Sequence, residues 1–180
     1  MMTVRLIAHT PEPEKVVAAA AKLCYSDAHI TDLLDGLTEE KTAKFLTMLS
    51  DLGHASPIEH ASFTFGIEGV SRTLLAQITR HQNEVKFMSA SLQYSNYTGQ
   101  ADFAVPYSIM TAPAVVRELY LKSCNESMKC YEALCTAGSG HDAAGYATPQ
   151  GLRNVLLISI IVIKARHWFH TPHQCITIPS

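Results

Sequence analysis

The residue types best suited to chemistry gather in two short stretches of this chain. Residues 53–60 read Gly-His-Ala-Ser-Pro-Ile-Glu-His, and residues 77–81 read Gln-Ile-Thr-Arg-His. Gln77 and Arg80 would share one face of a helix, because they are three residues apart. A guanidinium beside an amide and an imidazole can hold an anion and reach the edge of a heterocycle. Arginine and histidine are costly to bury without partners, so a ligand site explains this cluster better than a core does.

The first stretch also has a purely structural explanation. Ser56 can cap a helix that starts at Pro57, and Glu59 would then complete a capping box. Taken alone, this is the better explanation of the residues. The second stretch follows at a short distance, however, and loops between a helix and a strand often carry functional residues. Together the two stretches favour a binding site that includes His54 and Ser56.

The order of these motifs resembles that of the flavin-dependent thymidylate synthases. GHASPIEH is followed by the strand-like SFTFGIEGVSR and by a helix that ends in QITRH. The resemblance runs from about Val4 to about His170. It implies an enzyme that methylates dUMP at C5, with methylenetetrahydrofolate as co-substrate and with hydride from FAD that NADPH has reduced. It also implies a homotetramer whose sites are built from several subunits.

The same resemblance implies roles for single residues. His54 and His81 are the candidates for catalytic positions beside the reacting rings, and no covalent nucleophile is required. Arg80 would bridge the flavin and nucleotide phosphates. The implied flavin contacts are Ser56, Arg80, His81 and Gln82. The implied nucleotide contacts are Gln77, Arg80, Ser89, Ser91, Gln93 and Tyr94.

The chain departs from the family pattern at basic positions. Gln82 and Gln93 stand where the family has arginine, and Val155 stands where it has a basic residue. A guanidinium binds phosphate better than an amide does, and each lost contact should cost about 1.5–3 kcal/mol. The alternative to a working synthase is therefore a catalytically impaired paralogue that still binds flavin. The basic residues considered as compensation are Lys86, Lys122 and Arg153.

The bulk composition narrows the class of protein. The chain has 180 residues, of which 47% are hydrophobic and 17% charged, so we expect one globular domain over residues 1–180. A net charge of −2 argues against generic nucleic-acid binding. The longest apolar run, Val155 to Ile163, is too short to cross a membrane and indicates a buried strand. With no signal-peptide pattern in residues 1–10, a cytoplasmic protein is expected.

The cysteines and histidines predict neither disulfides nor a metal site. The five cysteines form no CxxC pair, and three of them fall in one expected helix, which indicates small hydrophobic residues in a reducing compartment. Three histidines near the end of the sequence are spaced by three residues, but Pro172 interrupts their helix and no carboxylate accompanies them. These histidines are His167, His170 and His173, with Cys175 nearby.

Local patterns predict an α+β fold, a small β-sheet packed with long helices as in the resembled family. Strands are expected over Val4–His9, Ser62–Val70 and Leu156–Ile163. Helices are expected over 11–24, 39–52, 72–78, 112–137 and 141–147, with a last one from Ala165. Residues 85–97 are left open. The side chains expected to face the core are Phe45, Met48 and Leu52, and then Val115, Leu119, Met128, Tyr131 and Leu134.

Overall fold

The structure, a computed structural model, describes residues 2–81, 85–100 and 102–162. The chain divides into two compact units. Among the residues described, unit 1 comprises 2–4, 66–80, 87–100 and 102–157, and unit 2 comprises 5–65, 81, 85–86 and 158–162. The boundary between them passes through all four strands. The expectation of a single domain stays a prediction.

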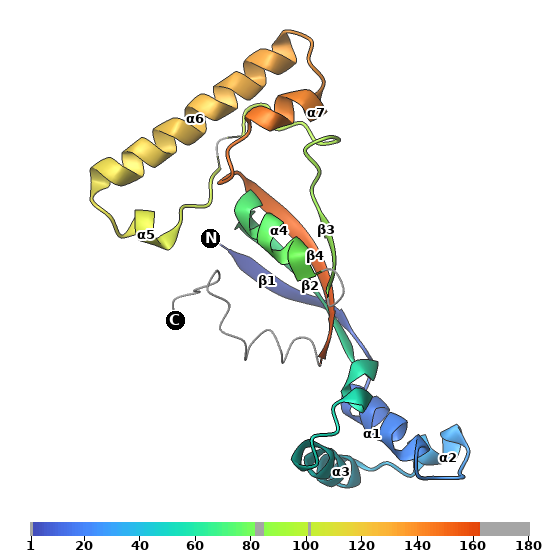
Figure 1. The fold of residues 1–180 in the computed structure, drawn as a ribbon. Helices are drawn as coiled ribbons and strands as arrows, with labels where there is room; N and C mark the ends of the chain where they lie inside the picture. Colours follow the sequence, from blue (N-terminus) through green and yellow to red (C-terminus); the bar gives the residue numbers. More distant parts are fainter. Residues whose placement is uncertain (1, 82–84, 101, 163–180) are drawn as a thin grey trace. The chain divides into compact units, whose positions relative to one another are not determined.

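A four-stranded antiparallel sheet confirms the predicted α+β class. Its strands are β1 (Thr3–His9), β2 (Ser62–Ser71), β3 (Val85–Ser89) and β4 (Arg153–Ile161), in the order β1-β2-β4-β3 (Figure 1). Three of these strands were predicted, and β3 lies in the segment that the sequence left open.

The exposure of β4 corrects one expectation. Its buried residues alternate along the strand, at Asn154, Leu156, Ile158 and Ile160, as one face of a pleated strand requires. Val155 and Leu157 on the other face are 50% and 45% exposed. The prediction of a buried strand is therefore correct for one face only, because antiparallel sheets can leave the other face uncovered.

Unit 2 carries the N-terminal helices α1 (Pro13–Leu23), α2 (Ile30–Asp35) and α3 (Glu39–Asp51), followed by the 3-10 helix η1 (Ser56–His60). Ala18 and Ala19 of α1 are buried with Leu37, and Phe45 and Leu46 of α3 pack against them. Alanines allow the helices this close approach. Helix α1 contacts α2, α3 and η1.

The ends of α3 are where the sequence predicted them. The Thr38 hydroxyl accepts a hydrogen bond from Lys41 N at 3.4 Å, and Gly53 follows the helix with a φ of 71°. The predicted inner face is only partly correct, because Met48 and Leu52 are 46% and 61% exposed. Thr42 and Leu49 are buried in their place, which rotates the buried stripe around the helix.

Unit 1 carries α4 (Arg72–Ile78), α5 (Tyr107–Met110), the long α6 (Ala114–Thr136), α7 (His141–Ala144) and the 3-10 helix η3 (Gly145–Ala147) (Figure 1). Ser71 caps α4, as predicted, by accepting a hydrogen bond from Leu74 N at 3.1 Å. The 3-10 helix η2 (Thr79–His81) continues the chain from α4. The core of the unit consists of Tyr97, Phe103, Cys124, Met128, Tyr131, Ala144 and Leu152.

Helix α6 buries a narrower face than its sequence pattern suggested. Met128 and Tyr131 are buried, as expected, together with Cys124. Val115, Leu119 and Leu134 are exposed, so the expectation that they face the core is wrong. The stripe that meets Leu152 and Phe103 begins near Tyr120, and the N-terminal turns of α6 lie outside that contact.

Searches for other features were limited to the same residues. Across 2–81, 85–100 and 102–162, no helix has the length and hydropathy needed to cross a membrane. Within that part of the chain, no group of three or more histidine, cysteine or acidic side chains is arranged to hold a metal ion. The described cysteines, Cys24, Cys124, Cys130 and Cys135, are free. The C-terminal histidines and the helix expected from Ala165 lie outside the described residues.

Candidate functional site

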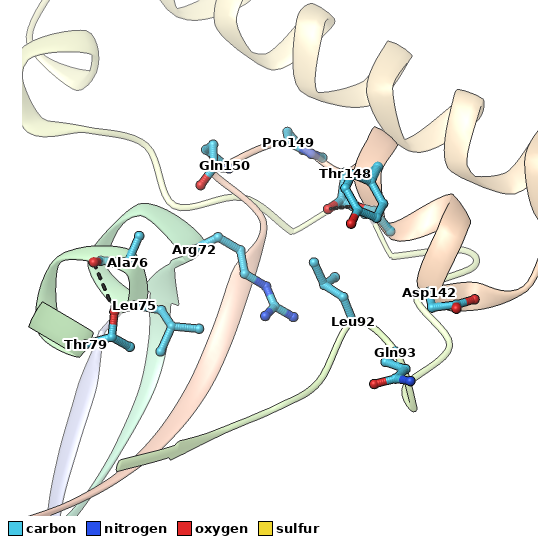
Figure 2. Close-up of a pocket in the computed structure, with 12 residues that line it drawn as sticks. Arg72, Leu75, Ala76, Thr79, Leu92, Gln93, Asp142, Thr148, Pro149 and Gln150 are labelled. Carbon is cyan, nitrogen blue, oxygen red and sulfur yellow. Dashed lines mark hydrogen bonds between the residues drawn. The ribbon is translucent and has the colours of Figure 1, made fainter. Parts of the chain in front are cut away.

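Unit 1 contains a pocket of about 670 Å³ around Arg72. Four segments form it: α4 with the first residue of η2 (Thr79–His81), the loop after β3, the α7–η3 turn, and the residues that lead into β4. Figure 2 shows the Arg72 guanidinium projecting between α4 and the Leu92–Gln93 loop. The lining residues are Arg72, Leu75, Ala76, Thr79, Leu92, Gln93, Asp142, Gly145, Tyr146, Thr148, Pro149 and Gln150.

Arg72 owes its place to the junction between β2 and α4. Ser71 ends the strand and caps the helix, so Arg72 is the first helical residue. Its Nη2 donates a hydrogen bond to Tyr97 Oη at 2.8 Å, and its Cζ lies 5.6 Å from the centroid of the same ring. Its Nε is buried and has no hydrogen-bond partner among the described residues. The side chain is thus held in place and keeps donor capacity for a ligand.

Tyr97 connects Arg72 to the core of the unit. Its hydroxyl also donates to Ser91 O at 3.3 Å, and its backbone N donates to Tyr131 Oη at 3.1 Å. Tyr131 is fully buried, and its hydroxyl lies 3.1 Å from His141 Nδ1. Burial is the main cause that raises the pKa of Tyr131, the hydrogen bond from Tyr97 opposes it, and the Cys135 thiol adds to it. Tyr131 therefore remains protonated at neutral pH.

The loop after β3 is shaped by Ser91. The Ser91 hydroxyl accepts hydrogen bonds from Gln93 N at 3.0 Å and from Tyr94 N at 3.3 Å. Such side-chain contacts to the next turn are common for serine. They direct Gln93 to the pocket wall and leave Tyr94 83% exposed.

The polar lining is mostly neutral. Among the lining residues that the structure describes, Arg72 is the only cation and Asp142 the only carboxylate. The Thr79 and Thr148 hydroxyls donate to Ala76 O at 3.1 Å and to Gly145 O at 2.8 Å, so their oxygens retain only acceptor capacity. With two glutamine amides, this set suits a small polar ligand that carries limited negative charge.

Of the predicted site residues whose side chains the structure describes, Gln93 alone lines this pocket. Gln77 is half-buried in α4, Arg80 is exposed in η2, and Ser89 is half-buried at the end of β3. In unit 2, His54 and Ser56 are exposed. His81 ends η2, while Gln82 lies outside the described residues. The roles expected for these residues stay predictions.

Sequence reasoning missed Arg72, Asp142, Thr148 and Gln150. One signal for Arg72 was present, because a basic residue in the first turn of a helix opposes the helix dipole. Its position there favours a functional role over a structural one. No local signal connected Asp142, Thr148 or Gln150 to the same pocket.

The basic residues considered as compensation are used differently. Arg153 Nη1 donates to Gly69 O at 3.0 Å, and its Nε lies 2.7 Å from Asp102 Oδ1. Gly69 has a φ of 76°, so Arg153 secures an irregular point of β2. Lys122 Nζ lies 3.9 Å from Glu126 Oε1 on the surface of α6, and Lys86 is exposed on β3. None of the three lines the pocket around Arg72.

Comparison with known proteins decides the family. A family model described as thymidylate synthase complementing protein matches residues 5–174. The chain belongs to the thymidylate synthase complementing protein family. This confirms the resemblance that the two short stretches indicated.

Relatives in this family carry the name flavin-dependent thymidylate synthase. The protein from Clostridium tetani is 42% identical over 135 residues, which cover 74% of this chain and 52% of the relative. The protein from Geobacter sulfurreducens is 32% identical over 168 residues, 93% of this chain and 72% of the relative. That from Nitratidesulfovibrio vulgaris is 33% identical, with 92% and 72% covered. The chain thus spans about half of the first relative and under three quarters of the others.

A solved structure shows the same fold. It is that of PolB from Streptomyces cacaoi, a UMP/dUMP methylase bound with 5-Br dUMP, with a TM-score of 0.74 and 20% identity. The match covers 93% of this chain and 76% of PolB. At this identity the likeness establishes the fold alone, and with it the predicted α+β class of the family.

The flavin in the relatives' name can be tested against residues of this chain. Arg80 offers an exposed guanidinium in η2, and Ser56 and His54 offer an exposed hydroxyl and imidazole. An anionic cofactor with a flat ring needs such groups, a cation for phosphate and polar or aromatic groups for the ring. Each unit therefore presents groups of the kinds that bind a flavin.

Proposed function

We propose that this chain is a flavin-dependent thymidylate synthase, which converts dUMP to dTMP with FAD, NADPH and methylenetetrahydrofolate. The observation that carries the proposal is the family match over residues 5–174, supported by relatives of that name at 32% and 33% identity over nine tenths of the chain. When bound, the flavin would supply the hydride, and the protein would supply binding and orientation.

In this proposal the flavin is held by Ser56, Arg80, His81 and Gln82. The guanidinium of Arg80 neutralises phosphate charge, and the hydroxyl of Ser56 donates a hydrogen bond. His54 and His81 lie against the rings. None of these residues forms a covalent bond with the substrate.

The nucleotide is held by Gln77, Arg80, Ser89, Ser91, Gln93 and Tyr94, and the pocket adds Arg72 to this set. Gln93 occupies a position where the family has arginine, and it lines the same pocket as Arg72. A guanidinium on the opposite wall can restore part of the missing positive charge. We therefore assign to Arg72 the phosphate contact that Gln93 makes only weakly.

Assembly as a homotetramer in the cytoplasm is part of the same proposal. Several large apolar side chains are exposed in the single chain, which is typical of surfaces that are covered by other subunits. They include Val4, Leu6 and Ile7 of β1 and Val115 and Leu119 of α6. Light scattering of the purified protein tests this assembly directly.

The deciding experiment measures tritium release from dUMP labelled at C5. Release that requires added FAD, NADPH and methylenetetrahydrofolate supports the synthase. Arg80→Ala, which removes the expected phosphate contact, should abolish release, while Lys44→Ala on the exposed surface of α3 serves as the matched control. A colourless protein that neither takes up FAD nor releases tritium overturns the proposal.

The second candidate is a flavin-binding paralogue without synthase activity. One observation favours it: the pocket that contains Gln93 has a single cation and a carboxylate among its lining residues. Each missing charged contact should weaken the binding free energy of a phosphate dianion in this pocket by about 1.5–3 kcal/mol. A yellow protein that binds FAD stoichiometrically but releases no tritium would establish this candidate.

A further inference from the structure

Three polar side chains meet where α6 turns into α7. His141 Nδ1 lies 3.1 Å from Tyr131 Oη and 3.6 Å from Cys135 Sγ. The rings of Tyr131 and His141 stack with centroids 6.4 Å apart and an interplanar angle of 20°. One ring nitrogen thus faces both a phenol and a thiol. In the sequence, these three residues are distant from those proposed to bind flavin.

These three side chains come together because of the turn between α6 and α7. Tyr131 and Cys135 are four residues apart on α6, so their side chains lie on one face. Gly138 follows the helix with a φ of 91°, a conformation that glycine adopts without strain. The chain then reverses, and His141 opens α7 against that face.

The protons in this cluster can be assigned from the hydrogen bonds. Tyr131 Oη already accepts the N–H of Tyr97, so its own proton is available for His141 or Cys135. Burial raises the pKa of Tyr131, which keeps this proton in place at neutral pH. His141 Nδ1 can accept the proton of Cys135. The resulting thiolate then has an imidazolium N–H and a phenol O–H beside it, and an imidazole at this distance is the usual means of activating a thiol.

The other described cysteines lack this arrangement. Cys124 is buried beside Tyr120, and burial raises the pKa of its thiol. Cys24 and Cys130 are exposed, and no histidine nitrogen lies within hydrogen-bond distance of them among the described residues. Cys135 is half-buried, with its side chain packed against the core cluster of unit 1.

The geometry points to Cys135 as a thiol activated by His141, a site at which the chain forms mixed disulfides with small disulfide compounds. The Cys135 thiolate attacks one sulfur of the disulfide, and a new S–S bond forms as the old one breaks. The second sulfur leaves as a thiolate and takes up the proton that His141 accepted. No other oxidant or reductant is required. The exchange itself uses neither the flavin nor the nucleotide of the proposed synthase, although Tyr131 also supports Arg72 through Tyr97.

The test treats the folded protein with oxidised glutathione, and in parallel with limiting iodoacetamide, and follows each cysteine by peptide mass spectrometry. At pH 7 we expect Cys135 to react about tenfold faster than Cys130, although Cys130 is more exposed, because an unactivated thiol is only a few per cent thiolate. Cys130 lies on the same helix and is the internal control.

His141→Phe keeps a ring against Tyr131 and removes the nitrogen. This variant should slow Cys135 by about tenfold and leave the rate at Cys130 unchanged. Equal rates at Cys135 and Cys130 in the unmodified protein would overturn the assignment, as would a Cys135 rate that His141→Phe does not change.

Discussion

The side chains of the pocket around Arg72 and those of the turn at His54–Ser56 differ in how they are held. In unit 1, Arg72 is bound by Tyr97, which is bound in turn by the fully buried Tyr131. In unit 2, the turn is fixed through its backbone, with His54 N bonded to Leu49 O at 3.0 Å, and its side chains are exposed. Their hydrogen bonds to other described residues are confined to the main chain.

This difference predicts which mutations should affect both stability and ligand binding, and which should affect ligand binding alone. A side chain held by the core contributes to stability as well as to the site. An exposed side chain on a turn contributes little to stability and can still be essential for a ligand. The predictions below test this contrast, beginning with the largest expected change in free energy.

Tyr131→Ala should destabilise the protein by about 3–5 kcal/mol, because it removes a fully buried ring and leaves Tyr97 N without its acceptor. Urea unfolding measures the change. Tyr94→Ala, which truncates a tyrosine that is 83% exposed, is the matched control and should change stability by less than about 0.5 kcal/mol. Equal losses would mean that the Tyr131 network does not support unit 1.

Gln93→Arg should strengthen dUMP binding by about ten- to a hundredfold, equivalent to about 1.5–3 kcal/mol, because it adds a charged contact to the pocket. Calorimetry measures the affinity. Gln100→Arg adds the same charge at an exposed residue outside the pocket and should have little effect. Gln82→Arg combined with Gln93→Arg should bind more tightly still. An equal gain in affinity from Gln100→Arg would show that the effect comes from the overall charge of the protein and not from a contact in the pocket.

Ser71→Ala should cost about 1 kcal/mol of stability through loss of the α4 cap. It should also weaken ligand binding, since α4 begins at Arg72. Thr38→Ala removes the corresponding cap of α3 in unit 2 and should cost a similar amount without affecting the pocket ligand. The comparison fails if both variants weaken binding equally.

Arg80→Ala and Ser56→Ala should each change the free energy of unfolding by less than about 0.5 kcal/mol, because both side chains are exposed. Loss of bound flavin is nevertheless expected, most completely for Arg80→Ala. Flavin absorbance after gel filtration and a melting curve on the same sample measure the two effects. Parallel losses of flavin and melting temperature would identify Arg80 as a structural arginine.

The sequence predicted the elements well because their signals are local. The cap at Ser71, the cap at Thr38 and the glycine stop at Gly53 are each decided within four residues, and all three are confirmed. The inward face of α6 was predicted less well. Which stripe of a helix is buried depends on its partners, and Val115 and Leu119 lie beyond the stretch of α6 that meets the core.

The site was harder to predict than the fold. The two motifs correctly identified the family, but the contact between Arg72 and Tyr97 joins residues 25 positions apart and has no sequence pattern of its own. Likewise, Gln150 and Asp142 reach the pocket only because the chain returns to it after α6. Arg153 was considered as a phosphate-binding residue because it lies near a position that is basic in the family. In the structure it instead stabilises a strand.

Tyr97 has a consequence for the thermodynamics of binding at Arg72. An arginine side chain carries about 2 kcal/mol of rotamer entropy, which a ligand ordinarily removes when it fixes the guanidinium. Tyr97 is anchored at its backbone by Tyr131, and its ring and hydroxyl already hold Arg72. Much of that ordering therefore occurs when the chain folds. A ligand that reaches the remaining donors of Arg72 meets a rigid fork, and little of its binding free energy is lost to immobilising it.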